Sequence, residues 1–506
     1  MNTFMNQLKN NFNYTYTENG ALTHVTTNNP VYDMFAMGAA YRNRTDSDCV
    51  LLFKNAFEYD ETLALKCLFY IRDCRGGQGE RRFFRVCLKW LAENYPNRLK
   101  PLLQYVPEYG RYDDWFELFE TQSEDDVLKL IRDQLTVDMF SEKNGISLLA
   151  KWLPSENASS RRTIQRAKRI RNYLNITAKE YRQMLSKLRE KINVLERLMS
   201  ANEWDKIEFD RIPSKAGLVY KNAFARRDII AKKYEAFAKD KTSKVNAATL
   251  YPYEVVYKAL RYDYIDDVDR IDDVDRAMTN KYWENLPDYL NGEDCSMMCV
   301  VDTSGSMDGW NAAAPINVAI SLGLYCAERM SGPFANHYIS FSSRPQLIET
   351  KGIDFVDKVK RIYATNLCDN TNLKAVFDLF LNTVLTHTVK KEDLPKTIIV
   401  ISDMEIDEAT SAWGYASRSQ YFRWSQTEAA TEMEKIREEW ASYGLTLPKL
   451  VYWNVDSRQA NILDFGPNVS FVSGMSPTLF KQVLTGKTGW ELCLETITAP
   501  RYENIK

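Results

Sequence analysis

The residues best suited to chemistry in this sequence are a carboxylate and two hydroxyls in one short segment. Asp302, Ser304 and Ser306 form a DxSxS motif directly after an apolar run, Cys295–Val301, that is typical of a buried strand. These side chains are hard oxygen donors, which suit Mg²⁺ or Mn²⁺ and do not suit zinc. Because ligands of open α/β sheets bind beyond the carboxyl ends of the strands, the motif lies where such a sheet would form a site.

Two later segments offer further oxygen donors. Thr371 lies in a polar loop before a predicted helix, and Asp403 directly follows a predicted strand. The alternative is that Asp and Ser after a strand only cap the next helix, but the strand placement and the two further loops favour a cation site. Glu405 and Asp407 are close to Asp403 and could tune such a site, although we expect them to be exposed on the surface.

The order of these residues resembles the metal-ion-dependent adhesion site (MIDAS) of von Willebrand factor A domains, whose pattern is DxSxS, a downstream Thr and an Asp after a later strand. The resemblance implies that Mg²⁺, or Mn²⁺, is held by the residues of these three segments: Asp302, Ser304, Ser306, Thr371 and, directly or through water, Asp403. Since neutral hydroxyls supply much of the shell, the cation would keep positive charge and an open position. It would then recruit an anionic oxygen from an acidic protein or a phosphate ligand.

The elements that must position these residues alternate between strand and helix over residues 291–506. Alternation of this kind predicts a parallel, doubly wound, Rossmann-like α/β sheet. By the resemblance above, this sheet would belong to a von Willebrand factor A-like domain. The predicted strands are 295–301, 337–341, 397–402, 450–455 and 469–472, and the predicted helices are 317–330, 372–385, 427–443 and 477–484.

Residues 1–290 have a different, helical pattern. Between Asp60 and Phe140, apolar residues recur near a 3.6-residue period, as in Leu63, Cys67 and Ile71. Amphipathic helices joined by short loops predict antiparallel helix pairs stacked in a HEAT-like repeat array, although no fixed-period repeat is visible.

A basic segment, 161–233, lies within this helical half. Its first part, Arg161–Arg197, contains twelve lysines and arginines against three glutamates, a net charge of +9. Either these cations form a solvated face held by ion pairs, or they contact phosphates; the charge excess favours phosphates. The candidate RNA contacts here are Arg161, Arg162, Arg166, Lys168, Arg169 and Arg171. Trp152, Tyr173 and Tyr181 could stack on bases, but we expect each of them in the core.

A glycine-rich segment, Arg72–Arg82, is a second candidate for RNA contact. Its glycines predict a turn before a helix whose free amides would attract anions, with four arginines adding charge. These are Arg72, Arg75, Arg81 and Arg82. The segment is either a helix-connecting turn with solvated arginines or a phosphate-contacting loop; it is not a P-loop, because GxxxxGK[ST] is absent.

An acidic segment, 263–276, separates the two halves and contains two copies of IDDVDR. It is interpreted as a solvated acidic linker or helix face. The alternatives are a strip that competes with nucleic acid for the basic surface, or one that binds cations.

The order of the two halves resembles the layout of Ro ribonucleoproteins, in which a TROVE module, a ring of helical repeats, binds RNA and a von Willebrand factor A domain follows. Arg72–Arg81, Val106–Trp115 and Ile401–Glu405 look closer still to an uncharacterised Ro-like family. The resemblance covers most of the chain. It implies a non-catalytic protein whose helical array binds single-stranded or structured RNA and whose metal site binds an acidic partner.

Composition excludes several other classes. The 506 residues carry 66 basic and 68 acidic side chains, so the whole chain is not a basic nucleic-acid coat. Nine cysteines without a CxxC pair indicate a reducing cytoplasmic setting, and no apolar run is long enough to span a membrane. Three histidines limit catalysis. The alternative function is a protein–protein adhesion scaffold without RNA binding; a metal-dependent phosphodiesterase is the least favoured, and we predict no enzyme activity.

Overall fold

The computed structural model describes most of the chain. The described residues are 13–142, 145–192, 195–260, 273–309, 311–341, 344–352, 354–364, 372–387, 389–406, 431–464, 466 and 468–506. They divide into two compact units: a sheet unit of Met1–Cys67 with Leu250–Asn504 and Lys506, and a helical unit of Leu68–Thr249 with Ile505.

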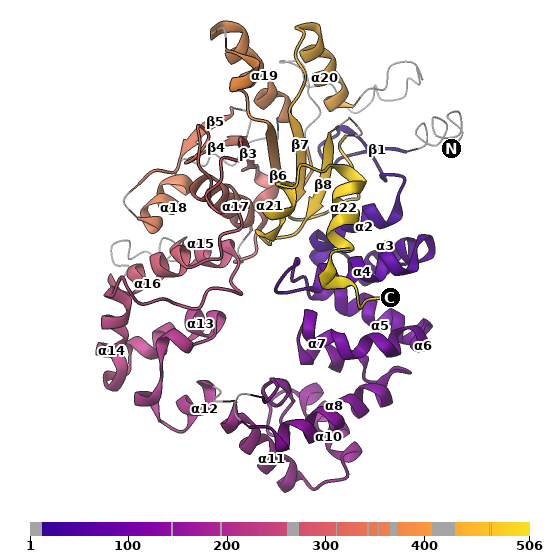
Figure 1. Cartoon of the computed structure of the whole chain (residues 1–506), viewed down its shortest axis with the longest axis vertical. Coiled ribbons are helices and arrows are strands. Elements are labelled where there is room, and N and C mark those ends of the chain that lie inside the picture. Colours follow the sequence, from indigo (N-terminus) through magenta and orange to yellow (C-terminus); the bar gives the residue numbers. More distant parts are fainter. Residues whose placement is uncertain are drawn as a thin grey trace. The chain divides into compact units, whose positions relative to one another are not determined.

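The sheet unit contains a mixed, mostly parallel six-stranded sheet with the order β5-β4-β3-β6-β7-β8 (Figure 1). Four neighbouring pairs are parallel, and β5 pairs with β4 in the antiparallel sense. The strands are β3 (Met297–Asp302), β4 (His337–Phe341), β5 (Gln346–Glu349), β6 (Thr397–Ser402), β7 (Lys449–Asn454) and β8 (Val469–Ser473). The central strands β3 and β6 are buried along their whole length, which explains their continuous apolar sequences. The sequence predicts a parallel sheet; the structure has an α/β sheet that is mostly parallel, and the antiparallel β5 is a strand that was not predicted.

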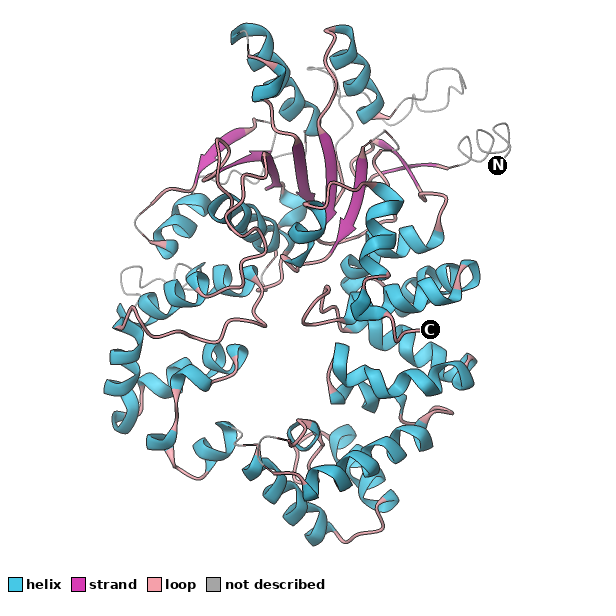
Figure 2. Ribbon diagram, in the orientation of Figure 1, coloured by secondary structure: helices cyan, strands magenta, loops and turns pink. Residues whose placement is uncertain are grey.

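Helices cover both sides of this sheet (Figure 2). They are α17 (Pro315–Arg329), α18 (Phe355–Ala364), α19 (Leu373–His387), α20 (Glu432–Ser442), α21 (Thr478–Val483) and α22 (Gly489–Ile497). Helix α17 packs closely on β3 at Gly323, where an added Cβ would lie 2.5 Å from Cγ2 of Val301. Its close packing against β3 supports the strand that carries the DxSxS motif.

Segments from the first half of the chain belong to the same compact unit. The elements are β1 (Tyr14–Tyr16), β2 (Leu22–His24), α2 (Pro30–Met37), α3 (Asp46–Tyr59), α15 (Pro252–Leu260) and α16 (Asp273–Glu284). The hydroxyl of Tyr32 accepts a hydrogen bond from the amide of Phe471 in β8. Trp283 stacks on Phe355 of α18 with ring centroids 4.2 Å apart. Burial of these aromatic rings explains why the segments pack with the sheet.

The helical unit has only helices and 3₁₀ turns among its described residues. The unit begins within α4 (Glu61–Arg72). Its longer helices are α5 (Arg82–Asn94), α8 (Glu124–Phe140), α10 (Arg161–Tyr173), α11 (Ala178–Lys191), α13 (Ser214–Ala225) and α14 (Asp228–Lys239). Its short elements are α6 (Pro96–Leu99), η2 (Lys100–Tyr105), α7 (Val106–Tyr109), η3 (Tyr112–Leu118), α9 (Leu149–Trp152), α12 (Leu195–Ser200), η4 (Trp204–Lys206) and η5 (Phe209–Arg211). Ser160 caps α10, and a capping box of Thr177 and Glu180 starts α11. In the described parts of both units, no helix is long and apolar enough to cross a bilayer.

Candidate metal centre and nucleic-acid interface

The DxSxS motif begins at the carboxyl end of a central strand. Asp302 is the last residue of β3, and Ser402 is the last residue of the neighbouring β6. The hydroxyl of Ser402 donates to Oδ2 of Asp302 at 2.5 Å, and the amide of Ser304 donates to Oδ1 of Asp302 at 2.9 Å. All three residues are buried, so the carboxylate of Asp302 is held in one orientation.

Asp403 and the hydroxyls of Ser304 and Ser306 lie beside Asp302 at this end of the sheet. Oγ of Ser304 is 2.9 Å from Oγ of Ser306. Oδ1 of Asp403 accepts from the amide of Glu405 at 3.2 Å, whereas its buried Oδ2 has no hydrogen-bond donor among the described residues. Met404, directly after Asp403, adopts a left-handed φ of 67°, a sparsely populated conformation that is common at functional sites.

The electrostatics of this site favour a bound cation. Burial, and then the negative charge of Asp403, raise the pKa of Asp302 to about 7. Burial also raises the pKa of Asp403, against the opposing hydrogen bonds from the Glu405 amide and the Ser306 hydroxyl. Two buried carboxyls, one of them with an oxygen that accepts no hydrogen bond, and two hydroxyls are a donor set that fits a hard divalent cation. Among the described residues no group of three His, Cys, Asp or Glu side chains could hold a metal, so hydroxyls would have to complete the set.

Arg458 borders the same carboxyls and was not predicted from the sequence. Its Nε lies 3.8 Å from Oδ2 of Asp403, and its guanidinium donates to the carbonyl of Ser306. It also pairs with Glu18 at 3.3 Å. This charge lowers the pKa of Asp403, opposing the effect of burial. A metal ion and Arg458 would therefore compete for Asp403.

The predicted surface exposure of Glu405 is wrong. Glu405 is 1% exposed, because the turn between β1 and β2 covers it. Its carboxylate accepts from the amide of Glu18 at 2.7 Å and from Nδ2 of Asn461 at 2.9 Å. Burial raises its pKa to about 7. Thr371 and Asp407 lie outside the described residues, as does most of the acidic segment, whose last residues 273–276 begin α16.

Many cations of α10 are paired with acids that precede the basic segment in sequence. Arg162 and Arg166 pair with Glu117 at 2.8 and 3.2 Å. Arg169 pairs with Glu120 at 2.7 Å and with Glu124 at 2.9 Å, and Arg171 pairs with Glu156 at 2.9 Å. These four arginines therefore follow the ion-paired alternative.

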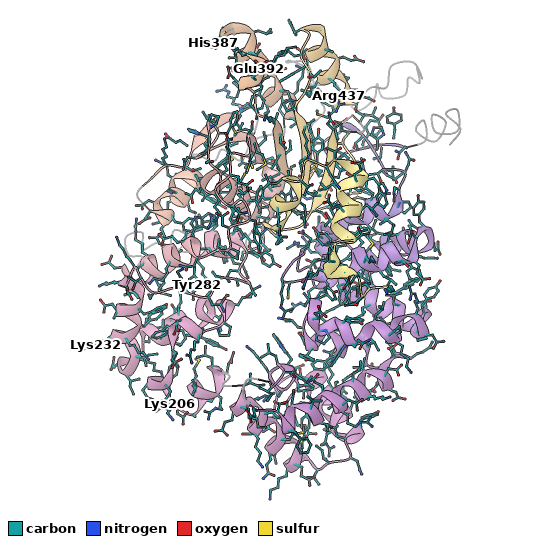
Figure 3. The ribbon with its side chains drawn as sticks, in the orientation of Figure 1. Lys206, Lys232, Tyr282, His387, Glu392 and Arg437 are labelled. Atoms are coloured by element: carbon teal, nitrogen blue, oxygen red, sulfur yellow. The ribbon has the colours of Figure 1, made fainter. Side chains whose placement is uncertain are left out.

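Five other cations, on α10 and the following helix α11, are exposed. Within the described residues they make no side-chain hydrogen bond or ion pair. We call them the unpaired cations: Arg161 and Lys168 on α10, and Lys179, Arg182 and Lys187 on α11. Arg161 and Lys168 are seven residues apart, which places both on one helix face. Further along the basic segment, Lys206 and Lys232 are also exposed (Figure 3). Lys206 is paired with Glu203.

The glycine-rich segment forms a tight turn that folds back onto α4. The amide of Gln78 donates to the carbonyl of Tyr70, and an added Cβ at Gly77 would lie 2.0 Å from that oxygen. Arg72 is buried with its NH2 2.7 Å from Oδ2 of Asp114, so it is not accessible to RNA and this predicted contact is corrected. The other three arginines of the segment are at least partly exposed: Arg75, Arg81 and Arg82.

The three aromatic residues considered for base stacking differ in exposure. Tyr181 is fully buried and donates to the carbonyl of Pro154 at 2.9 Å, as expected of a core residue. Trp152 and Tyr173 are partly exposed, and each ring lies near an arginine: Arg111 is 4.2 Å from the Trp152 ring centroid, and Arg132 is 5.9 Å from that of Tyr173.

Comparison with known proteins finds families without an assigned function. Residues 296–499 match the family model described as "Domain of unknown function (DUF7788)", and residues 17–108 and 156–293 match "Domain of unknown function (DUF2828)". The chain is also 28% identical over 518 residues to "Uncharacterized protein L728" of Acanthamoeba polyphaga mimivirus. That alignment covers 94% of this chain and 85% of the viral protein.

Proposed function

We propose that this chain is a non-catalytic RNA-binding protein of Ro-like architecture. The helical unit would serve as a TROVE-like array of HEAT-like repeats, and the sheet unit would contain a von Willebrand factor A-like domain. The observation that carries the proposal is the set of unpaired cations on α10 and α11. Exposed lysines and arginines without local acidic partners keep their positive potential and attract the RNA backbone.

The metal site would serve a second partner. Asp302, Ser304, Ser306 and Asp403 would hold Mg²⁺, or Mn²⁺, with Thr371 as a further ligand by resemblance to a MIDAS. The bound ion would supply an open, electrophilic coordination position for a carboxylate of an acidic protein or for a phosphate. The buried Ser402 would keep Asp302 oriented through its 2.5 Å hydrogen bond. None of these steps breaks a covalent bond in the ligand, so no enzyme activity is proposed.

A protein–protein adhesion scaffold without RNA binding is the second candidate. The buried Asp302–Asp403 pair favours it, since a cation held there could bind an acidic partner whether or not the helical unit contacts RNA. The described cysteines are free thiols, which suits the proposed cytoplasmic, reducing location of either candidate.

The first experiment is a titration of a fluorescently labelled single-stranded RNA with the full chain at several salt concentrations. We expect binding with a steep dependence on salt, because each phosphate contact releases counterions. A duplex RNA of the same length, titrated in parallel, distinguishes single-stranded from structured ligands. Absence of binding at low salt to both RNAs would reject RNA binding and favour the scaffold.

A further inference from the structure

A group of arginines in the helical unit carries more positive charge than its acidic neighbours balance. We call it the arginine cluster. It consists of six arginines around three carboxylates: Arg72, Arg81, Arg85, Arg111, Arg162 and Arg166 around Asp113, Asp114 and Glu117.

Each carboxylate of the cluster is already shared by at least two guanidinium groups. Asp114 accepts from Nε of Arg72 at 2.8 Å and from Nε of Arg85 at 2.6 Å. Asp113 accepts hydrogen bonds from Nε and NH2 of Arg111, each at 2.9 Å, and it also pairs with Arg85 at 2.8 Å.

Glu117, the third carboxylate, is shared in the same way. Its Oε2 pairs with Arg162 and Arg166, and its Oε1 lies 3.4 Å from NH1 of Arg85. The acidic oxygens of the cluster are thus engaged, and they do not neutralise all of the cations around them.

Arg81 is the member of the cluster that these carboxylates do not bind. It is exposed and makes no side-chain hydrogen bond or ion pair within the described residues. It directly precedes α5, whose first turn contains no acidic residue and whose first amide, that of Arg82, donates to the Glu80 carboxylate at 2.8 Å. Partial burial, and then the positive charges of Arg85 and Arg111, lower the pKa of Arg81. Partial burial and the charges of Arg162 and Arg85 likewise lower the pKa of Arg166, against the pull of Glu117.

We propose that the arginine cluster is a phosphate-binding site in which Arg81 contacts the phosphate directly. A guanidinium offers two parallel N–H donors that match phosphate oxygens, and a dianionic group would offset most of the excess charge of the cluster. Arg111 packs over the ring of Trp152, which holds one side of the site in place. Arg85, paired with Asp114, adds a further positive charge. This inference rests on the proposed function where the phosphate belongs to RNA; a free phosphate would be recognised by the same chemistry.

The test compares the full-length protein with the variant Arg81→Gln. Within the described residues the Arg81 side chain makes no hydrogen bond or ion pair, so the variant should unfold close to the temperature of the unmodified chain. Arg211→Gln is the matched control, because Arg211 is exposed and its one ion pair within the described residues is with the neighbouring Glu208 at 2.8 Å. The probes are inorganic phosphate, measured by calorimetry, and a short single-stranded RNA with or without a 5′-phosphate, measured by fluorescence anisotropy.

We expect inorganic phosphate to bind and Arg81→Gln to weaken that binding about tenfold or more, as loss of a charge-assisted hydrogen bond should. Arg211→Gln should bind phosphate as the unmodified chain does. Undetectable phosphate binding, or equal binding by Arg81→Gln, would overturn the proposal. A tenfold loss that appears only with the 5′-phosphorylated RNA would assign the site to an RNA end, and an equal loss with both RNAs would assign it to the RNA backbone.

The two proposals fail in different ways. If Arg81→Gln binds phosphate and RNA normally, while variants of the unpaired cations bind RNA weakly, the phosphate site is rejected and RNA binding stands. If phosphate binding depends on Arg81 but no RNA binds at low salt, the phosphate site stands with a free phosphate ligand and RNA binding is rejected.

Discussion

Neutralising three of the unpaired cations should flatten the salt dependence of RNA binding. The triple variant is Arg161→Gln, Lys168→Gln and Arg182→Gln, whose side chains are exposed and make no hydrogen bond or ion pair within the described residues. Each phosphate contact of a single strand contributes about 0.7 to the slope of log K against log salt, so loss of three contacts should lower the slope by about 2. Fluorescence anisotropy of a labelled single-stranded RNA, over about 50 to 200 mM salt, measures this slope.

A second triple variant separates specific contacts from net charge. Lys89→Gln, Arg211→Gln and Lys239→Gln remove the same charge from the helical unit, but each of these side chains is already paired with a neighbouring acid. The control should keep the original slope. An unchanged slope in the test variant, or equal flattening in both variants, would refute the assignment of RNA contacts to α10 and α11. Circular dichroism of both variants checks that the helices are intact.

Three other variants address the metal site and the buried charges. Asp302→Ala should abolish Mg²⁺-dependent binding of an acidic partner and leave RNA affinity unchanged; loss of both would contradict separate sites. Arg458→Gln should raise the affinity for Mg²⁺ in calorimetry, because Asp403 loses its competing cation, and an unchanged affinity would refute the competition. Asp114→Ala should destabilise the protein by about 3–5 kcal/mol in chemical denaturation, because Arg72 is left buried without a counter-ion; a loss below about 1 kcal/mol would contradict this role.

The sequence predicts where the motif residues lie because local features determine their positions. An apolar run of strand length leads directly into DxSxS, and the structure has β3 end at Asp302. A second apolar run leads into Ser402 and Asp403, and β6 pairs with β3 in parallel. Parallel pairing brings the carboxyl ends of the two strands together, so the motif residues become neighbours without any long-range information beyond strand order.

Long-range contacts explain what the sequence does not predict. The charge excess in 161–197 is counted along the chain, yet Glu117 and Glu124 pair with arginines of α10 that lie more than forty residues further along the sequence. Burial of Arg72 depends on Asp114 and on the space left at Gly110, where an added Cβ would lie 2.3 Å from Oδ2 of Asp114. Sequence periodicity reports which face of a helix is apolar, but not which partner covers its charged face.

Contacts between distant segments also limit where the chain can be divided for experiments. The two family models meet between residues 293 and 296, which suggests that 291–506 is a separable domain. In the structure, however, Glu18 and Asn19 bond to Glu405, and Tyr32 bonds to β8. A fragment that begins at residue 291 would uncover the buried Glu405 and lose the partner of Arg458 next to Asp403. Since both changes alter the charge around the candidate metal ligands, Mg²⁺ affinity measured on such a fragment would not be that of the full chain.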